Sequence, residues 1–191
     1  SACSLSKTRS QTVPGEGNPT SRIMFIGEAP GYNEDQRGTP FVGRAGNILE
    51  QLLQSIGLNR GEVFITNMVK CRPPKNRDPQ VEELNSCSNF LDDQIIAINP
   101  SIIVTLGRFS FAKFFPDLSL NRSRGHPHLW NGINIFPMYH PAAALYNPAL
   151  RPRLELDFSK IPQLLDNFLK ADLMTSETAP DVTERQLGLF D

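Results

Sequence analysis

The sequence of 191 residues lacks any long apolar run. A membrane-spanning helix needs about 20 consecutive, mostly apolar residues, so we expect no membrane contact. The N-terminus is polar and has no apolar segment of the kind that a secretory signal carries. With only three cysteines, a dense disulfide scaffold is excluded, and free thiols suit a reducing compartment. These absences together predict a cytoplasmic protein.

The chain also lacks a strong charge of one sign, since its 19 basic and 20 acidic residues nearly cancel. The charges are unevenly distributed, because residues 172–191 carry five acidic residues and one basic residue. The rest of the chain is therefore mildly basic. Four basic side chains between residues 70 and 77 could neutralise nucleic-acid phosphates, although an ordinary solvated surface would have the same composition.

The hydrophobic pattern predicts a mixed fold. Short apolar segments predict strands at residues 22–27, 63–67, 101–107 and 133–139. Helical spacing predicts helices at residues 48–56, from an Asp78 N-cap to about residue 98, at 108–115 and at 158–171. The polar segment 28–40 is expected to be a loop. The alternation of strands and helices along the chain favours the α/β class. We expect a three-layer αβα sandwich around a central, mainly parallel four-stranded sheet. We expect one domain at residues 1–171 and a flexible acidic tail at 172–191.

Three positions at the ends of predicted strands could form a site. Gly27, Asn67 and His140 each end or follow a buried apolar segment. Ligand sites of open parallel sheets lie beyond the carboxyl ends of the strands, so these residues should meet in one cleft. The Asn67 amide offers a donor and an acceptor, although asparagine at a strand end is also a common turn residue.

Four motifs occur in a fixed order along the chain. They are GEAPG at residues 27–31, PFVGRAG at 40–46, TNMVKCRPPKNR at 66–77 and HPAA at 140–143. Together with the spacing of Cys3, Cys71 and Cys87, they resemble the family 4, iron–sulfur uracil-DNA glycosylases over roughly residues 1–170. The resemblance implies a uracil-DNA glycosylase-like fold. It also implies a base excision repair enzyme that hydrolyses the N-glycosidic bond of uracil in DNA and leaves an abasic site.

The resemblance implies roles for the residues around the cleft. Phe41 would stack on the flipped uracil, with a plain core phenylalanine as the alternative. Asn67 would pair with uracil N3–H and O4, and His140 would stabilise the negative charge that develops at O2. The uracil-binding set is therefore Gly27, Ala29, Gly31, Phe41 and Asn67.

Two residues are candidates for the catalytic carboxylate. Elsewhere in the superfamily an aspartate stands in the place of Ala29, and Glu28 is its nearest substitute for positioning water. Glu34 is the second candidate, and it could also crowd uracil C5 and exclude thymine. Gly31 replaces the tyrosine that does so elsewhere in the superfamily. Either carboxylate could instead cap the next helix. The catalytic set is therefore Glu28, Glu34 and His140.

Segment 141–153 resembles the family's loop that enters the duplex. Leu145 and Tyr146 are the candidates for an apolar wedge in the vacated stack, and Arg151 would contact phosphate. The basic segment after Asn67 would also contact the DNA backbone. The DNA-binding set is therefore Arg72, Lys75, Arg77, Leu145, Tyr146 and Arg151.

Cys3, Cys71 and Cys87 are expected to be ligands of a metal site. Four thiolates could hold zinc or a [4Fe–4S] cluster, and only the resemblance favours a structural [4Fe–4S] cluster. That family uses four cysteines, the first two as Cys-x-x-Cys. The fourth ligand is expected to be a cysteine immediately preceding Ser1.

The last residues turn apolar again after the acidic segment. Gln186, Leu187, Leu189 and Phe190 resemble the peptide by which bacterial replication and repair proteins bind the sliding clamp. The alternative is that this segment folds back onto the domain. We expect a monomer whose partners are uracil-containing DNA and the clamp. The alternative function is a catalytically inactive uracil- or DNA-binding module associated with the replication machinery.

Overall fold

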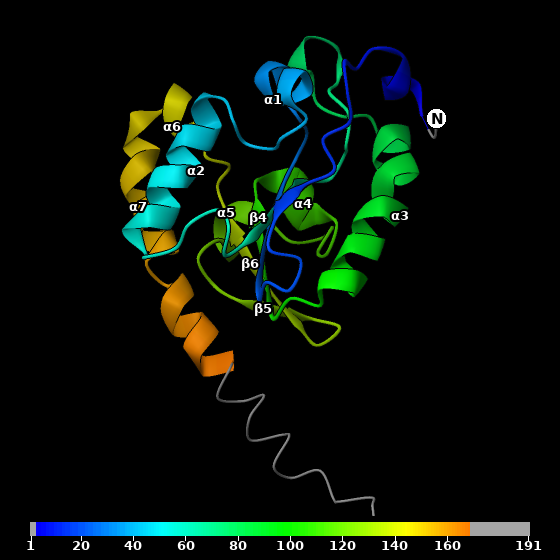
Figure 1. The fold of residues 1–191 in the computed structure, drawn as a ribbon. Helices are drawn as coiled ribbons and strands as arrows, with labels where there is room; N and C mark the ends of the chain where they lie inside the picture. The colour runs from blue at the N-terminus through cyan, green and yellow to red at the C-terminus, as the bar shows by residue number, and fades with distance from the viewer. Residues whose placement is uncertain (1–2, 169–191) are drawn as a thin grey trace, which may run out of the picture.

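A computed structural model of the chain describes residues 3–168 (Figure 1). Its centre is one six-stranded sheet with the order β1-β3-β2-β4-β6-β5. The strands are β1 (Glu16–Gly17), β2 (Ile23–Gly27), β3 (Phe64–Asn67), β4 (Ile102–Leu106), β5 (His128–Trp130) and β6 (Ile133–Met138). The middle four strands are parallel to one another, and β1 and β5 pair antiparallel at the two edges.

The four predicted strands are therefore confirmed, but the sheet has six strands rather than four. The two strands that the sequence does not reveal are only two and three residues long. Each lies at an edge and exposes part of its surface, so neither carries the buried apolar run that marks a central strand.

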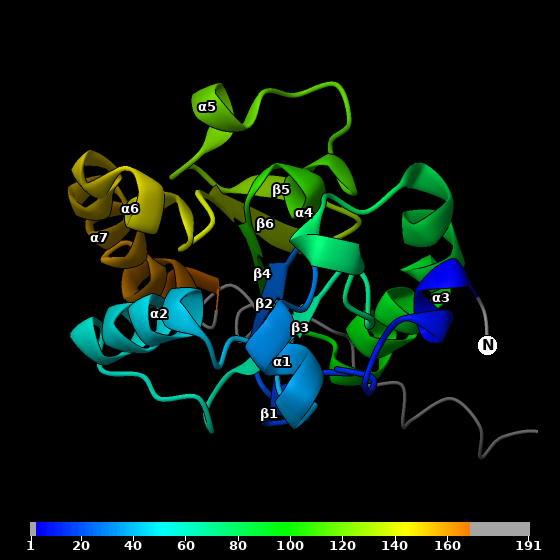
Figure 2. The same ribbon diagram turned by 90° about the horizontal axis from the view of Figure 1, so that it is seen from above.

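Helices cover both faces of the sheet, which confirms three layers (Figure 2). One face packs against α2 (Arg44–Ser55) and α7 (Arg151–Phe158), and Phe25, Leu52 and Phe158 share that core. The other face packs against α3 (Val81–Ile98) and α4 (Arg108–Ala112), and Met24, Ile26 and Leu91 share the second core. The side chains of β2 alternate between the two cores because successive side chains of a strand point to opposite faces of the sheet.

Three helix predictions need correction. Segment 28–40 contains α1 (Tyr32–Arg37). This helix was not predicted because its residues are mostly polar and charged. Segment 141–153 is not a loop, because it holds α6 (Ala143–Tyr146), η3 (Pro148–Leu150) and the start of α7. The N-cap of α3 is Gln80 rather than Asp78, since the Glu83 carboxylate accepts the Gln80 N–H. The remaining short helices are η1 (Ser4–Lys7), η2 (Pro74–Asn76) and α5 (Leu120–Ser123).

The other helix predictions are confirmed with shifted bounds. Helix α2 ends just before Gly57, and α4 begins at the predicted residue but is shorter. Residues 161–168 are helical, within the predicted range 158–171. The predicted domain end at 171 and the tail at 172–191 lie outside the described residues. Within residues 3–168, no helix is both long and apolar enough to span a bilayer.

Candidate active site

A cleft of about 660 Å³ opens beyond the carboxyl ends of the parallel strands. It brings together most of the residues that the sequence places in the uracil site and at the catalytic centre. Its lining includes Glu28, Ala29, Gly31, Glu34, Phe41, Asn67, Arg77, His140, Leu145 and Tyr146. Gly27 is not a lining residue but packs beneath two of them, opposite Asn67 in the β2–β3 register.

The floor of the cleft depends on a glycine. A Cβ atom at Gly27 would lie 2.4 Å from Asn67 Oδ1 and 2.6 Å from the Phe41 ring. Both contacts are far inside van der Waals separation, so any larger residue would displace the amide or the ring. Gly27 therefore has a structural role in the site by allowing Asn67 and Phe41 to approach each other.

Phe41 has an unusual backbone conformation that its neighbours enforce. Its φ is 53°, in the left-handed region that phenylalanine rarely adopts. Arg60 donates one hydrogen bond of 3.1 Å to the Phe41 carbonyl and one of 2.6 Å to the Pro40 carbonyl. A Cβ at Gly46 would lie 1.8 Å from the Phe41 oxygen, so only glycine fits there. Such enforced strain is concentrated at functional sites. The sequence did not reveal Arg60, which lies outside the four motifs.

The Asn67 side chain has an unsatisfied acceptor. Asn67 is 2% exposed, and its Oδ1 atom is buried without a hydrogen-bond partner in the described part of the chain. Buried polar atoms are nearly always paired, because an unpaired one costs about 1–3 kcal/mol. An acceptor left open at the wall of a cleft is suited to a ligand that brings an N–H or O–H donor.

His140 presents one defined ring nitrogen to the cleft. The Ala142 N–H donates to His140 Nδ1 at 3.1 Å, so in the neutral ring the proton lies on Nε2. Burial lowers the pKa of His140 to about 4, and the Glu34 charge opposes this shift. The ring stacks on Phe41 with 5.5 Å between centroids. At neutral pH, His140 is therefore an uncharged N–H donor.

The two candidate carboxylates differ in their surroundings. Glu34 accepts three backbone N–H groups, from Gly31 at 3.1 Å, Val42 at 2.9 Å and Gly43 at 2.8 Å. It thereby fastens the start of α1 to the Phe41 loop. Desolvation raises the pKa of Glu28 to about 7; the Asp78 charge adds to this shift, and Arg108 opposes it. Glu28 has the properties of a proton acceptor, whereas Glu34 has those of a clamp.

Glu34 and Gly31 occupy adjoining space. A Cβ at Gly31 would lie 2.7 Å from Glu34 Oε2. A bulky residue at position 31 would therefore collide with the Glu34 carboxylate in its present place. That Glu34 fills the volume that a tyrosine at position 31 takes elsewhere in the superfamily stays a prediction.

At the rim, the two wedge candidates are also unlike. Tyr146 is 88% exposed, whereas Leu145 is half-buried and packs against the core of the α2 face. Two further lining residues were missed from the sequence, namely Arg44 at the first position of α2 and Tyr32 at the first position of α1. Arg44 belongs to the quoted motif at 40–46, which is the signal that could have found it.

The predicted DNA-contacting cations are only partly at the cleft. Arg77 lines the cleft, but it forms a bidentate pair with Glu83 at 2.6 and 2.8 Å. The Arg72 guanidinium lies 5.0 Å above the Tyr32 ring, and Lys75 is exposed. Arg151 pairs with Glu155 at 2.8 Å and with Gln51 at 3.0 Å, and it is not among the lining residues.

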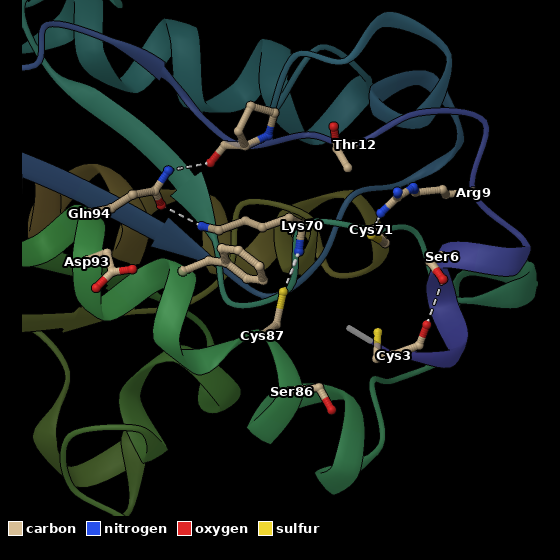
Figure 3. Close-up of a pocket in the computed structure, with 12 residues that line it drawn as sticks. Cys3, Ser6, Arg9, Thr12, Lys70, Cys71, Ser86, Cys87, Asp93 and Gln94 are labelled. Atoms are coloured by element: carbon tan, nitrogen blue, oxygen red, sulfur yellow. Dashed lines mark hydrogen bonds between the residues drawn. The ribbon is translucent and has the colours of Figure 1, made fainter. Parts of the chain in front are cut away.

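The three cysteines line a second cavity of about 460 Å³, between the N-terminal segment and α3 (Figure 3). Two sulfurs already have donors: Arg9 Nη1 lies 2.9 Å from Cys71 Sγ, and the Lys70 N–H lies 3.3 Å from Cys87 Sγ. Within residues 3–168, no three His, Cys, Asp or Glu side chains are grouped closely enough to hold a metal ion. The structure therefore places the predicted ligands around one cavity without a mononuclear metal site.

The predicted clamp-binding residues, Gln186, Leu187, Leu189 and Phe190, lie outside the described residues. The histidines at 126 and 128 lie away from the cleft lining. His128 packs against Phe111 and Phe115 rather than against a catalytic group.

Comparisons with known proteins agree with this geometry. The family model described as the uracil DNA glycosylase superfamily matches residues 14–160. A type-4 uracil-DNA glycosylase of Sulfurisphaera tokodaii is 54% identical, with 85% of this chain and 78% of the relative covered. One of Saccharolobus solfataricus is 52% identical, with 87% and 85% covered.

A solved structure supports the fold independently. The solution structure of a candidate uracil DNA glycosylase from Methanosarcina acetivorans superposes with a TM-score of 0.52 at 14% identity. The match covers 80% of this chain and 98% of the Methanosarcina acetivorans chain. The family match, the relatives and the convergence of the motifs on one cleft lead to one conclusion: the chain belongs to the type-4 uracil-DNA glycosylases.

Proposed function

We propose that the cleft removes uracil from DNA by hydrolysing the bond between uracil N1 and the deoxyribose C1′ carbon. The observation that carries the assignment of residues is the buried, unpaired Oδ1 atom of Asn67 beside Phe41 and His140. Uracil presents an N3–H donor beside its O4 acceptor, and a carboxamide offers the complementary acceptor and donor. Cytosine presents the opposite polarity, so it would leave Asn67 Oδ1 unpaired.

The reaction uses two groups on opposite sides of the breaking bond. His140 Nε2–H donates to uracil O2 as the base leaves with the bonding electron pair. Glu28 accepts a proton from the water whose oxygen bonds to C1′, and this yields an abasic site and the uracil anion, which takes up a proton from solvent as Glu28 returns its own to solvent. A neutral imidazole is sufficient for this role, since a hydrogen bond stabilises the uracil anion without full proton transfer.

Access to the base requires the nucleotide to leave the duplex. Tyr146 is the better wedge candidate, because it projects at the rim with 88% of its surface exposed. Arg44 lines the cleft, Arg72 stacks on the lining residue Tyr32, and Lys75 is exposed, so these three are the cations proposed to bind phosphates. Arg151 is a weaker candidate than the sequence indicates, because Glu155 and Gln51 already bind its guanidinium.

We further propose that Cys3, Cys71 and Cys87 hold a structural iron–sulfur cluster, as the family name and the shared cavity support. Arg9 and the Lys70 N–H would donate hydrogen bonds to two of the bound sulfurs. When bound, the cluster would tie the N-terminal segment, the loop after β3 and α3 together, and glycosidic hydrolysis needs no electron from it.

The C-terminal peptide is proposed as a clamp-binding segment on the strength of its sequence. An apolar group after an acidic tether is suited to insertion into a pocket on a partner. Deleting residues 186–191 should abolish binding to a sliding clamp in a pull-down and leave excision from short oligonucleotides unchanged. Loss of excision on free DNA would show instead that the segment belongs to the domain.

The test of function is excision from a uracil-containing oligonucleotide, detected by alkaline cleavage at the abasic site. The intact chain should cleave uracil DNA, and Asn67→Asp should lose discrimination between uracil and cytosine because the amide donor becomes an acceptor. Binding without cleavage would support the alternative of an inactive module. Unchanged discrimination in Asn67→Asp would remove that residue from base recognition.

A further inference from the structure

Lys70 is a buried cation that the mechanism does not use. It lines the cysteine cavity, three residues after Asn67, and it is only 6% exposed. Its Nζ atom donates to Thr66 Oγ1 at 2.6 Å and to the Asn67 carbonyl at 2.8 Å. It also donates to Gln94 Oε1 at 2.7 Å (Figure 3). Three acceptors therefore surround the amino group, while burial lowers the pKa of Lys70 to about 7.

The acceptors of this cage are themselves held in place. Thr66 Oγ1 and Gln94 Nε2 both donate to the Pro14 carbonyl, at 2.7 and 2.8 Å. This fixes the orientation of the Gln94 amide, because its nitrogen is committed to Pro14 and its oxygen therefore faces Lys70. Lys70 cannot shift without breaking contacts to two further segments.

The backbone of Lys70 adds two more connections. Its N–H lies 3.3 Å from Cys87 Sγ on α3, and its carbonyl accepts the Val13 N–H at 2.8 Å. One residue thus joins the end of β3, the cysteine-bearing helix and the N-terminal segment. The Asn67 carbonyl is the point at which this network reaches the uracil cleft.

The geometry has a direct effect on Asn67. The Lys70 amino group donates to the Asn67 carbonyl, while the Oδ1 atom of the same residue is buried and has no partner within residues 3–168. A turn of this peptide plane would move the Cα–Cβ bond and aim Oδ1 away from its position. The contact of Oδ1 with Gly27 leaves little room for such movement.

We propose that Lys70 is a positioning residue that holds Asn67 in the orientation required to recognise uracil, and that ties this recognition to helix α3. The inference rests on the proposed function of the cleft. It assigns to Lys70 an effect on selectivity for the base, transmitted through the Asn67 main chain rather than through contact with DNA.

The test uses Lys70→Met in the full chain, since methionine keeps the apolar stem and removes the ammonium. The probe is an oligonucleotide with one 2′-fluorinated deoxyuridine, whose glycosidic bond resists hydrolysis, and a matched oligonucleotide with cytosine at that position. We expect Lys70→Met to weaken binding of the uracil probe about tenfold and to leave binding of the cytosine probe unchanged. Lys113→Met removes a nearby lysine that pairs with Asp92 instead, and it should bind both probes as wild type does.

The outcomes separate this inference from the proposed function. If wild type binds both probes equally, the proposed recognition of uracil fails. If wild type prefers uracil and Lys70→Met keeps that preference, or weakens both probes alike, the positioning role is wrong. If Lys70→Met does not fold, Gln94→Leu decides, because it removes one acceptor of the cage from a partly exposed position. It should reduce the uracil preference about threefold, and an unchanged preference would overturn the inference.

Discussion

The two cavities of the molecule differ in how their polar groups are satisfied. In the uracil cleft, Asn67 Oδ1 lacks a partner within residues 3–168, and Glu28 is a carboxyl group whose pKa is raised to about 7. Around the cysteine cavity, two of the thiol sulfurs accept N–H donors, and Lys70 Nζ has three hydrogen-bond acceptors. The polar groups of the uracil cleft can still form hydrogen bonds with a ligand. The polar groups around the cysteine cavity instead hydrogen-bond to one another and hold separate segments of the chain together.

The residues proposed for catalysis and those that stabilise the fold therefore lie around different cavities, on the two sides of the loop that follows β3. Changes in the cleft should therefore alter the rate and leave stability nearly unchanged. Changes around the cysteine cavity should alter stability first. Four substitutions test that division.

The largest effect is expected for Glu28→Gln, because a general base contributes roughly 10²–10⁴-fold to a rate. Since the pKa of Glu28 is raised to about 7, its carboxyl is neutral and inactive at lower pH. The single-turnover rate of wild type should rise about tenfold per pH unit below pH 7 and level off above it, and Glu28→Gln should lose this dependence. Glu62→Gln, far from the cleft, is the control. A greater loss in Glu34→Gln, with Glu28→Gln near wild type, would reverse the assignment.

The next largest effect is expected for His140→Ala, at roughly 10²–10³-fold in the single-turnover rate, the usual consequence of losing one oxyanion donor. Because the pKa of His140 is lowered to about 4, the ring stays neutral across the working range and should add no titration of its own between pH 5 and 8. His126→Ala, an exposed histidine outside the cleft lining, should behave as wild type. Activity of His140→Ala within twofold of wild type would exclude His140 from the mechanism.

Cys71→Ser is expected to affect the other cavity. It should remove bound iron and visible absorption and lower the midpoint of thermal unfolding by roughly 5–10 °C, as about 2–3 kcal/mol would for a domain of this size. Ser86→Ala changes a residue of the same cavity without touching a sulfur and should retain iron. Zinc alone, or no metal, in the unmodified protein would contradict the iron–sulfur assignment.

The smallest effect is expected for Glu83→Gln, which breaks the pair with Arg77 at the start of α3. The hydrogen bond from Arg77 is the largest of the effects that lower the pKa of Glu83 to about 2. A carboxyl with a lowered pKa stabilises the fold above its ordinary pKa and ceases to do so as pH falls toward 2. Glu83→Gln should therefore lower the unfolding midpoint by roughly 3 °C at pH 7, and the difference should vanish near pH 2. Glu82→Gln, its exposed neighbour, should show no such pH-dependent difference.

The sequence predicted the parts of the fold that strong patterns determine. The four parallel strands are buried apolar runs, and the motifs at their ends converge on the cleft as expected for an α/β sheet. Helix α1 was missed because its sequence is almost wholly polar and its start depends on Glu34 bonding to Gly31. The different surroundings of Glu28 and Glu34 also required coordinates, since two carboxylates six residues apart are told apart only by their partners in space.

The close fit of Gly31 to Glu34 has a consequence for how such an enzyme could change its substrate range. The two positions share one volume, so a larger side chain at 31 is accommodated only when the carboxylate at 34 is shortened or withdrawn. A substitution at position 31 alone would place the new side chain against the Glu34 carboxylate. A library that randomises both codons together is therefore the practical route to larger residues at position 31.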